Sequence, residues 1–315
     1  MKSPSQKPTF INVGPGRCAT TWMYEILKAH PDISMAMVKE TEFFNTNFQN
    51  GQAWYENHFS PSTCTAIGEI SNAYYVDPRV AERVRKYNPQ MKIIFNLRKP
   101  QDLLQSFYGF ALRRGLQFAS STEALAAPIG RIMGSGYDFR RKKNCLNPGD
   151  QVTLLDSVLL SQKIRTFKEV FPPEQIYFFV YERLKQENEQ LLKEIYRFLG
   201  VDHKFIPDLA HKVINAAIVP NSKIVARLAT KVSFGLRRIG AYQLLSRLHR
   251  SELIKKLFYS QAAELPTTGE QRLLLDQSTL EMLAQEEETL RRWLPDLENY
   301  WTVADAKPVE VASAR

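Results

Sequence analysis

Short apolar runs alternate with longer helical patterns along this chain. An apolar segment at residues 9–13 is followed by a Gly-Pro-Gly turn at residues 14–16 and by a helical pattern from about Thr20 to Lys28. A second run, Met91 to Leu97 (MKIIFNL), is almost continuously apolar, as in a strand buried on both faces, and Pro100 begins the helical pattern that follows. Each of these regions predicts a strand, a turn and a helix in that order.

A third apolar run, Ile176 to Val180 (IYFFV), lies between two helical patterns, one at about 156–170 and one at about 183–199 that ends at Gly200. Strands that alternate with helices favour parallel pairing through right-handed crossovers. We therefore predict an α/β fold of three layers, in which a mostly parallel central sheet is flanked by helices.

Two regions differ from this pattern. Residues 119–150 are rich in Gly, Ser and basic side chains, which predicts a mobile loop or lid. Residues 220–265 look helical and basic, and a helix over Gln243 to Phe258 would place leucines opposite Arg247, Arg250, Lys255 and Lys256. This helix either packs on the core or meets an acceptor or a membrane surface. We expect one domain over residues 1–315, with 220–265 as a helical insertion on the acceptor side.

Charge and cysteine content narrow the class of protein. The 42 Lys and Arg against 33 Asp and Glu give a net charge of +9, which favours an anionic ligand, an acidic acceptor or peripheral contact with a membrane. Nucleic acid is not expected, because the basic residues are dispersed and zinc-finger spacing and an RNP motif are absent. Cys18, Cys64 and Cys145 are far apart, which favours neither a disulfide framework nor a zinc site.

The first ten residues, MKSPSQKPTF, contain no apolar stretch of the kind found in signal peptides. No later run approaches the ~20 apolar residues that a membrane-spanning helix needs. If the chain is complete, these features predict a cytoplasmic protein.

The turn after the first strand, Gly14 to Thr21 (GPGRCATT), can direct several backbone N–H groups and a helix N-terminus at a phosphate or sulfate. Compared with the ATP-binding pattern G-x-x-x-x-G-K-[ST], Ala19 replaces the second glycine and Thr20 replaces the lysine. This departure argues against a kinase and leaves Arg17 as the cation within the turn. The alternative is an ordinary β–α turn with no ligand.

A second candidate anion site follows the strand MKIIFNL. Arg98 stands at the end of that strand, and Ser106 lies eight residues later, two turns along the next helix, so both side chains can converge on one phosphate. Ligands of open α/β sheets bind at this edge of the sheet. Taken separately, each residue has a simpler explanation. An arginine before a helix is common, and a serine in a helix usually binds no ligand.

Together these two segments resemble the PAPS-dependent sulfotransferases, where PAPS is 3′-phosphoadenosine-5′-phosphosulfate, and the resemblance implies a P-loop-like fold. It implies that Arg98 and Ser106 hold the 3′-phosphate, and that the loop binds the 5′-phosphosulfate through Arg17, Cys18, Ala19, Thr20 and Thr21. The family usually has lysine at the position of Arg17. Tyr181, in a segment similar to the family's Y-E-D-L, is implied to lie near the adenine, and the ending at 290–294 (LRRWL) resembles the family's closing helix.

The segment Lys39 to Phe44 (KETEFF) resembles the K-E-x-x-F-F motif of heparan-type and bacterial sulfotransferases, which implies that Glu40 is the catalytic base. Lys39 would help to keep that carboxylate ionised. Glu69 lies in GEISNAY, similar to G-E-K-S-P-x-Y with Ile70 in place of lysine, and is the alternative base or an orienting carboxylate. Some relatives use histidine, for which His58 and His211 are the candidates.

The resemblance implies that the chain moves the sulfuryl group of PAPS to a hydroxyl or amine of a small-molecule, carbohydrate or carrier-bound acceptor and releases 3′-phosphoadenosine-5′-phosphate (PAP). Glu40 would take the acceptor's proton while Arg17 stabilises charge on the leaving phosphate oxygen, without a metal ion. The alternatives are a P-loop kinase and a non-catalytic basic adaptor. Neither the acceptor nor the oligomeric state can be read from the residues.

Overall fold

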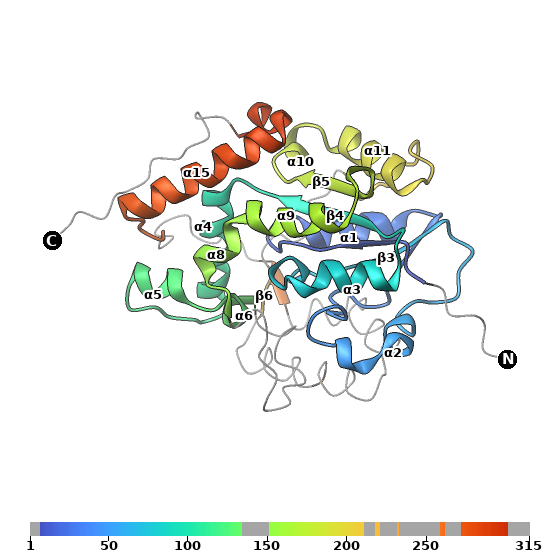
Figure 1. Ribbon diagram of the computed structural model, residues 1–315, viewed down its shortest axis with the longest axis horizontal. Coiled ribbons are helices and arrows are strands. Elements are labelled where there is room, and N and C mark those ends of the chain that lie inside the picture. Colours follow the sequence, from blue (N-terminus) through green and yellow to red (C-terminus); the bar gives the residue numbers. More distant parts are fainter. Residues whose placement is uncertain are drawn as a thin grey trace.

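A five-stranded sheet lies at the centre of the protein (Figure 1). The structure is a computed structural model, and it describes residues 7–133, 151–210, 218–220, 232, 259–261 and 272–301. All strand pairs in this sheet are parallel, in the order β2-β3-β1-β4-β5. The strands are β1 (Phe10–Asn12), β2 (Ile33–Met35), β3 (Ala66–Ile70), β4 (Lys92–Leu97) and β5 (Ile176–Val180).

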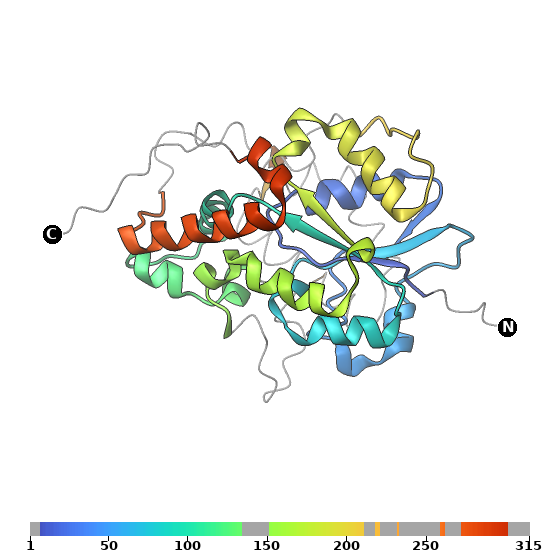
Figure 2. The same cartoon turned by 45° about the horizontal axis from the view of Figure 1, so that its top comes forward.

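Helices cover both faces of the sheet, as Figure 2 shows: α1 (Thr20–Ala29) and α11 (Asn188–Leu199) lie on one face, and α3 (Arg79–Tyr87) and α9 (Leu160–Val170) on the other. The alternation of side chains along a strand explains why two cores form. In β4, Ile93 and Phe95 pack into the core under α3 and α9, whereas Ile94 packs into the core under α1 and α11. The near-continuous apolar sequence of β4 therefore reflects burial on both faces, and the predicted three-layer α/β fold is confirmed.

The remaining helices lie around this sandwich. The α15 helix packs beside α4 and α9 and is followed by Trp301, which is fully buried. These helices are α2 (Gln52–Glu56), α4 (Pro100–Arg113), α5 (Ser121–Ala126), α6 (Ile129–Met133), α8 (Leu154–Val158), α10 (Arg183–Gln186) and α15 (Gln277–Trp293).

Register brings the sequence motifs to one edge of the sheet. The central strand β1 pairs with β3 on one side, with Asn12 opposite Ile70, and with β4 on the other, with Asn12 opposite Ile94. Because the three strands are parallel, the segments that follow their carboxyl ends are neighbours. These segments are the Gly-rich turn, the residues after Ile70, and Arg98 with the start of α4.

Several sequence-based predictions of individual elements were wrong. Strands β2 and β3 were not predicted, and the predicted helices at 156–170 and 183–199 are each broken, at Leu159 and at Glu187. Of the loop expected at 119–150, residues 121–133 instead contain α5 and α6, with the Ser120 side chain capping α5; residues 134–150 lie outside the described residues.

The region predicted as a helical insertion, 220–265, is described only in part. Its ends form an antiparallel pair of strands, β6 (Ile218–Pro220) and β7 (Tyr259–Gln261), which the sequence did not predict. The predicted helix from Gln243 to Phe258 lies outside the described residues, and so does His211.

Candidate functional site

A pair of buried asparagines on adjacent strands holds the Gly-rich turn. The Asn12 side chain donates to Oδ1 of Asn96 at 2.6 Å and accepts from the Gly14 N–H at 3.0 Å, and Asn96 donates to the Cys18 carbonyl at 3.0 Å. Both asparagines are fully buried. Since unpaired amides are costly in such a place, the pair fixes both ends of the turn relative to β1 and β4.

The Gly-rich turn has an unusual backbone conformation and packs closely against the segment after β3. Gly14 has a φ of 94°, and a Cβ there would lie 2.3 Å from the Asn72 carbonyl oxygen, so only glycine fits. Arg17 and Ala19 also have positive φ, of 67° and 57°, which is uncommon for residues with a Cβ. Among the described residues no side chain caps α1, and its first turn contains no acidic residue, so its N-terminal N–H groups can bind an anion.

Arg17, Arg98 and Ser106 come together beside this turn. Arg17 Nε donates to Ser106 Oγ at 3.2 Å, and Arg98 Nη1 donates to the Arg17 carbonyl at 2.8 Å. The guanidinium of Arg98 also lies over the Tyr181 ring, 4.4 Å from its centroid, and that of Arg17 lies over Phe110 at 5.0 Å. The two sequence elements predicted to bind phosphate therefore form one connected site, and Arg17 reaches from the first to the second.

The charges in this cluster fit an anionic ligand. Burial, and then repulsion from Arg113 and Arg98, lowers the pKa of Arg17 to about 10. The Nε of Arg98 is buried and has no hydrogen-bond partner among the described residues. A buried guanidinium donor without an acceptor is costly, and a phosphate oxygen would satisfy it. Arg113 was not among the residues predicted from the sequence.

Glu40 lies on the other side of the turn, in the segment after β2. Its backbone is left-handed, with a φ of 65°, and its N–H donates to the Ile70 carbonyl at 2.9 Å. The Oε1 atom accepts from Lys39 Nζ at 3.0 Å and from Asn72 Nδ2 at 2.5 Å. The side chain is 31% exposed, so an acceptor can reach it.

Glu69, the second candidate base, is fully buried at the end of β3. Its carboxylate accepts four hydroxyl hydrogen bonds, from Thr41 at 2.5 Å, Tyr74 at 2.6 Å, Ser71 at 2.8 Å and Tyr55 at 2.9 Å. Burial raises its pKa, and the four hydrogen bonds oppose that rise. A carboxylate that is saturated and shielded in this way suits the orienting role predicted for Glu69 better than the role of base.

A further carboxylate, Glu42, was not singled out from the sequence. It is 2% exposed, accepts from Asn45 Nδ2 at 2.6 Å and has a φ of 49°. Burial, followed by the charges of Glu40 and Glu69, raises its pKa to about 8. Glu42 is therefore protonated in the folded protein at neutral pH, which leaves Glu40 as the accessible carboxylate of this segment.

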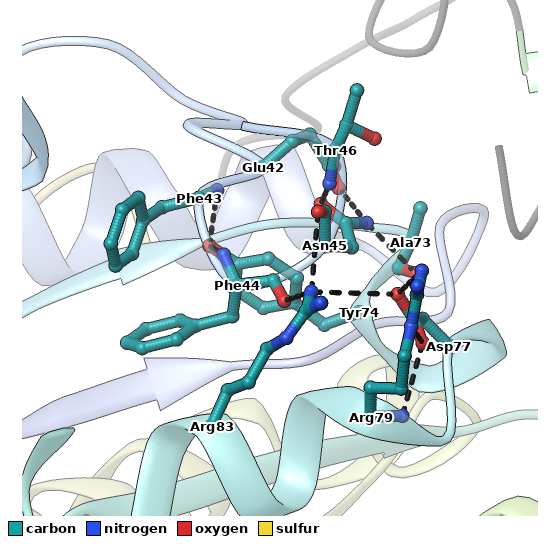
Figure 3. Close-up of polar contacts among 10 residues, drawn as sticks. All are labelled: Glu42, Phe43, Phe44, Asn45, Thr46, Ala73, Tyr74, Asp77, Arg79 and Arg83. Carbon is teal, nitrogen blue, oxygen red and sulfur yellow. Dashed lines mark hydrogen bonds and ion pairs between the residues drawn. The ribbon is translucent and has the colours of Figure 1, made fainter. Parts of the chain in front are cut away.

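Helix α3 anchors the segment that carries these glutamates (Figure 3). Arg83 Nη1 donates to the Phe44 carbonyl at 2.7 Å and lies 4.0 Å from the Asp77 carboxylate. Arg79 holds the same carboxylate with two hydrogen bonds of 2.9 Å. Asp77 is buried, so this network fixes the loop after Glu42 to the scaffold.

The pKa of Glu42 predicts how stability changes with pH. Between its unfolded value of 4.5 and about 8, the folded state keeps a proton that the unfolded state has lost, so stability falls as pH rises. Glu42→Gln removes this dependence, which amounts to at most about 1.4 kcal/mol per pH unit. Urea unfolding from pH 5 to 9 should show the free energy of unfolding of the variant rising relative to wild type up to about pH 8. The surface control Glu174→Gln should parallel wild type.

His58, one candidate for a catalytic histidine, is 1% exposed. Its Nδ1 lies 2.9 Å from the Trp54 carbonyl oxygen, and its ring packs against the Trp54 indole. These contacts indicate a structural histidine. Among the described residues, no group of three or more His, Cys, Asp and Glu side chains could hold a metal ion.

Fold and site together define an α/β protein of the P-loop-like class, in which the Gly-rich turn and Arg98 follow adjacent strands at one sheet edge. Residues 7–223 match the sequence profile of the sulfotransferase domain family. The match spans more than half of the chain, and the chain therefore belongs to that family. The predicted enzyme class, a sulfotransferase, is thereby confirmed.

Curated relatives and a solved structure agree with this assignment. The chain is 28% identical over 217 residues to human bifunctional heparan sulfate N-deacetylase/N-sulfotransferase 3, covering 64% of this chain and 23% of that protein. It is 33% identical over 110 residues to the membrane-associated sulfotransferase kil1 of Dictyostelium discoideum, covering 34% of this chain and 23% of that protein. A sulfotransferase from Alicyclobacillus acidocaldarius has the same fold, with a TM-score of 0.54 and 23% identity over 78% of this chain and 97% of that one.

The chain matches only about a quarter of the length of these curated relatives. Within the described ranges, no helix is both long enough and apolar enough to cross a membrane.

Proposed function

We propose that this chain transfers the sulfuryl group of PAPS to a hydroxyl or amine and releases PAP. The observation that carries the proposal is the junction formed by Arg17, Arg98 and Ser106 beside the uncapped N-terminus of α1. Two anion sites at neighbouring strand ends match a nucleotide that bears phosphate at both its 3′ and 5′ positions. Tyr181, under the Arg98 guanidinium, is placed for contact with the nucleotide base.

In the reaction, the S–O bond to the 5′-phosphate breaks, sulfur bonds to the acceptor oxygen or nitrogen, and the leaving oxygen keeps the electron pair. Glu40 takes the acceptor's proton, because it is the accessible carboxylate and Lys39 and Asn72 fix its position. The N–H groups of Cys18, Ala19, Thr20 and Thr21, with the two threonine hydroxyls, bind the 5′ side. Arg17 joins Arg98 and Ser106 at the 3′-phosphate, because its side chain lies beside Ser106.

The acceptor is a small molecule, a carbohydrate or a carrier-bound group. Carbohydrate amines should be tested first, since the human relative is named as a heparan sulfate N-sulfotransferase. We also propose that residues 1–315 form a single domain, that the protein is cytoplasmic, and that the reaction needs no metal ion.

The proposal predicts that the chain binds PAP and shows much weaker affinity for ATP. Calorimetry with both nucleotides should separate the sulfotransferase from a kinase, because only PAP carries the 3′-phosphate that Arg98 and Ser106 would hold. An acceptor screen with labelled PAPS then identifies the product. Tighter binding of ATP than of PAP would overturn the proposal, as would salt-dependent binding to liposomes or oligonucleotides without PAP affinity.

A further inference from the structure

Sulfuryl transfer needs positive charge between the Gly-rich turn and Glu40, and in this structure the side chain of Arg17 lies beside Ser106 on α4. During sulfuryl transfer the sulfuryl oxygens carry negative charge, and more charge develops on the one oxygen that bridges sulfur and phosphorus, so a fixed cation there lowers the barrier. Arg17 Nε instead donates to Ser106, and the ring of Phe110 stacks against its guanidinium. In this structure the Arg17 side chain is thereby directed toward α4.

Lys39 is the cation that contacts the N-terminus of α1. Its Nζ lies 3.3 Å from Oγ1 of Thr20, the first residue of that helix, and 3.0 Å from Oε1 of Glu40. Its side chain is 18% exposed. One ammonium group therefore stands between the helix end that binds the anion and the carboxylate that takes the proton.

We propose that Lys39 is a catalytic residue, whose ammonium group binds the sulfuryl group of the donor and stabilises the negative charge spread over its oxygens during transfer. The inference rests on the proposed function. An ammonium has three donors, so Lys39 can contact Thr20, Glu40 and a sulfuryl oxygen at once. Lys39 keeps its proton throughout, and the acceptor's proton goes to Glu40. Because Lys39 lies between Thr20 and Glu40, it can also hold the carboxylate of Glu40 close to the sulfuryl group.

The test separates this role from simple support of Glu40. Lys39→Ala should lower kcat by about a hundredfold, the usual cost of removing one such electrostatic donor. It should leave PAP affinity unchanged, because PAP lacks the sulfuryl group, and it should weaken binding of PAPS measured by calorimetry without acceptor. Lys39→Arg should recover part of kcat, and Lys28→Ala, at the far end of α1, is the matched control.

A double-variant comparison completes the experiment. If Lys39 acts only through Glu40, then Lys39→Ala adds nothing to Glu40→Gln; if it acts on the sulfuryl group, the double variant is slower than either single variant. Wild-type kcat in Lys39→Ala, an equal loss of PAP and PAPS affinity, or a double variant no slower than Glu40→Gln would each overturn the proposal. Wild-type protein that neither binds PAP nor transfers sulfate would instead contradict the proposed function itself.

Discussion

Glu40→Gln should lower kcat by about a hundredfold or more while PAP affinity stays at the wild-type level. Glutamine keeps the shape of the side chain and can still contact Asn72, but it cannot accept the acceptor's proton. Glu69 cannot take over, because it is fully buried and bonded to four hydroxyl groups. The loss should therefore appear in the chemical step and not in donor binding.

The measurement is steady-state turnover with a competent acceptor, together with PAP calorimetry on the same preparations. Glu25→Gln, on α1, serves as the matched control and should keep wild-type kcat. Undiminished turnover of Glu40→Gln would remove Glu40 from the mechanism. A parallel loss of PAP affinity would show that the substitution disturbs the turn that binds the nucleotide.

Arg98→Ala should weaken PAP binding by about tenfold to a hundredfold, since hydrogen bonds to charged groups contribute about 1.5–3 kcal/mol. The variant loses the buried Nε donor that has no partner among the described residues, the stacking on Tyr181 and the hydrogen bond to the Arg17 carbonyl. The PAP affinity of Arg98→Lys should lie between those of wild type and Arg98→Ala, because lysine keeps the charge but lacks the planar guanidinium fork.

PAP titration of these variants by calorimetry tests the assignment, and the surface variant Arg165→Ala on α9 is the control. With saturating PAPS, kcat of Arg98→Ala should recover toward wild type, because the residue binds the part of the nucleotide that does not react. Wild-type PAP affinity in Arg98→Ala would place the 3′-phosphate elsewhere.

The sequence predicted strands β1, β4 and β5, because each is a short apolar run next to a turn or a helical pattern. The run KIIFNL of β4 is apolar on both faces, and Pro100 marks the start of α4. In β3 the sequence AIGEI includes Gly68 and Glu69, which are atypical of a strand interior. Glu69 can be buried there because hydroxyl groups from distant positions, such as Thr41 and Tyr55, reach it. No local sequence pattern could predict these hydrogen bonds to Glu69.

The sequence predicted part of the candidate site, but it did not predict the geometry of the site or the presence there of Arg113 and Glu42. The turn at Gly14 and the pair Arg98 and Ser106 were expected at one edge of the sheet, and the structure places them there; Glu40 lies at the same edge, where its N–H donates to the Ile70 carbonyl. The direction of Arg17 could not be predicted, because it depends on positive φ angles at Arg17 and Ala19, where the sequence has no glycine. The asparagine pair that fixes the turn was also missed, since its contacts join β1 to β4, 84 residues apart.

The carboxylate of Glu182 connects the start of α4 to the residues that follow α15. It accepts from the Lys99 N–H at 3.0 Å, next to Arg98, and from the indole N–H of Trp301 at 2.9 Å. The stretch that matches the family profile stops at residue 223, well before that tryptophan. A protein trimmed to the matched stretch would leave Glu182 without its indole donor and uncover the backbone that supports Arg98. The stretch that matches the family thus leaves out a side chain, that of Trp301, which contacts the support of Arg98.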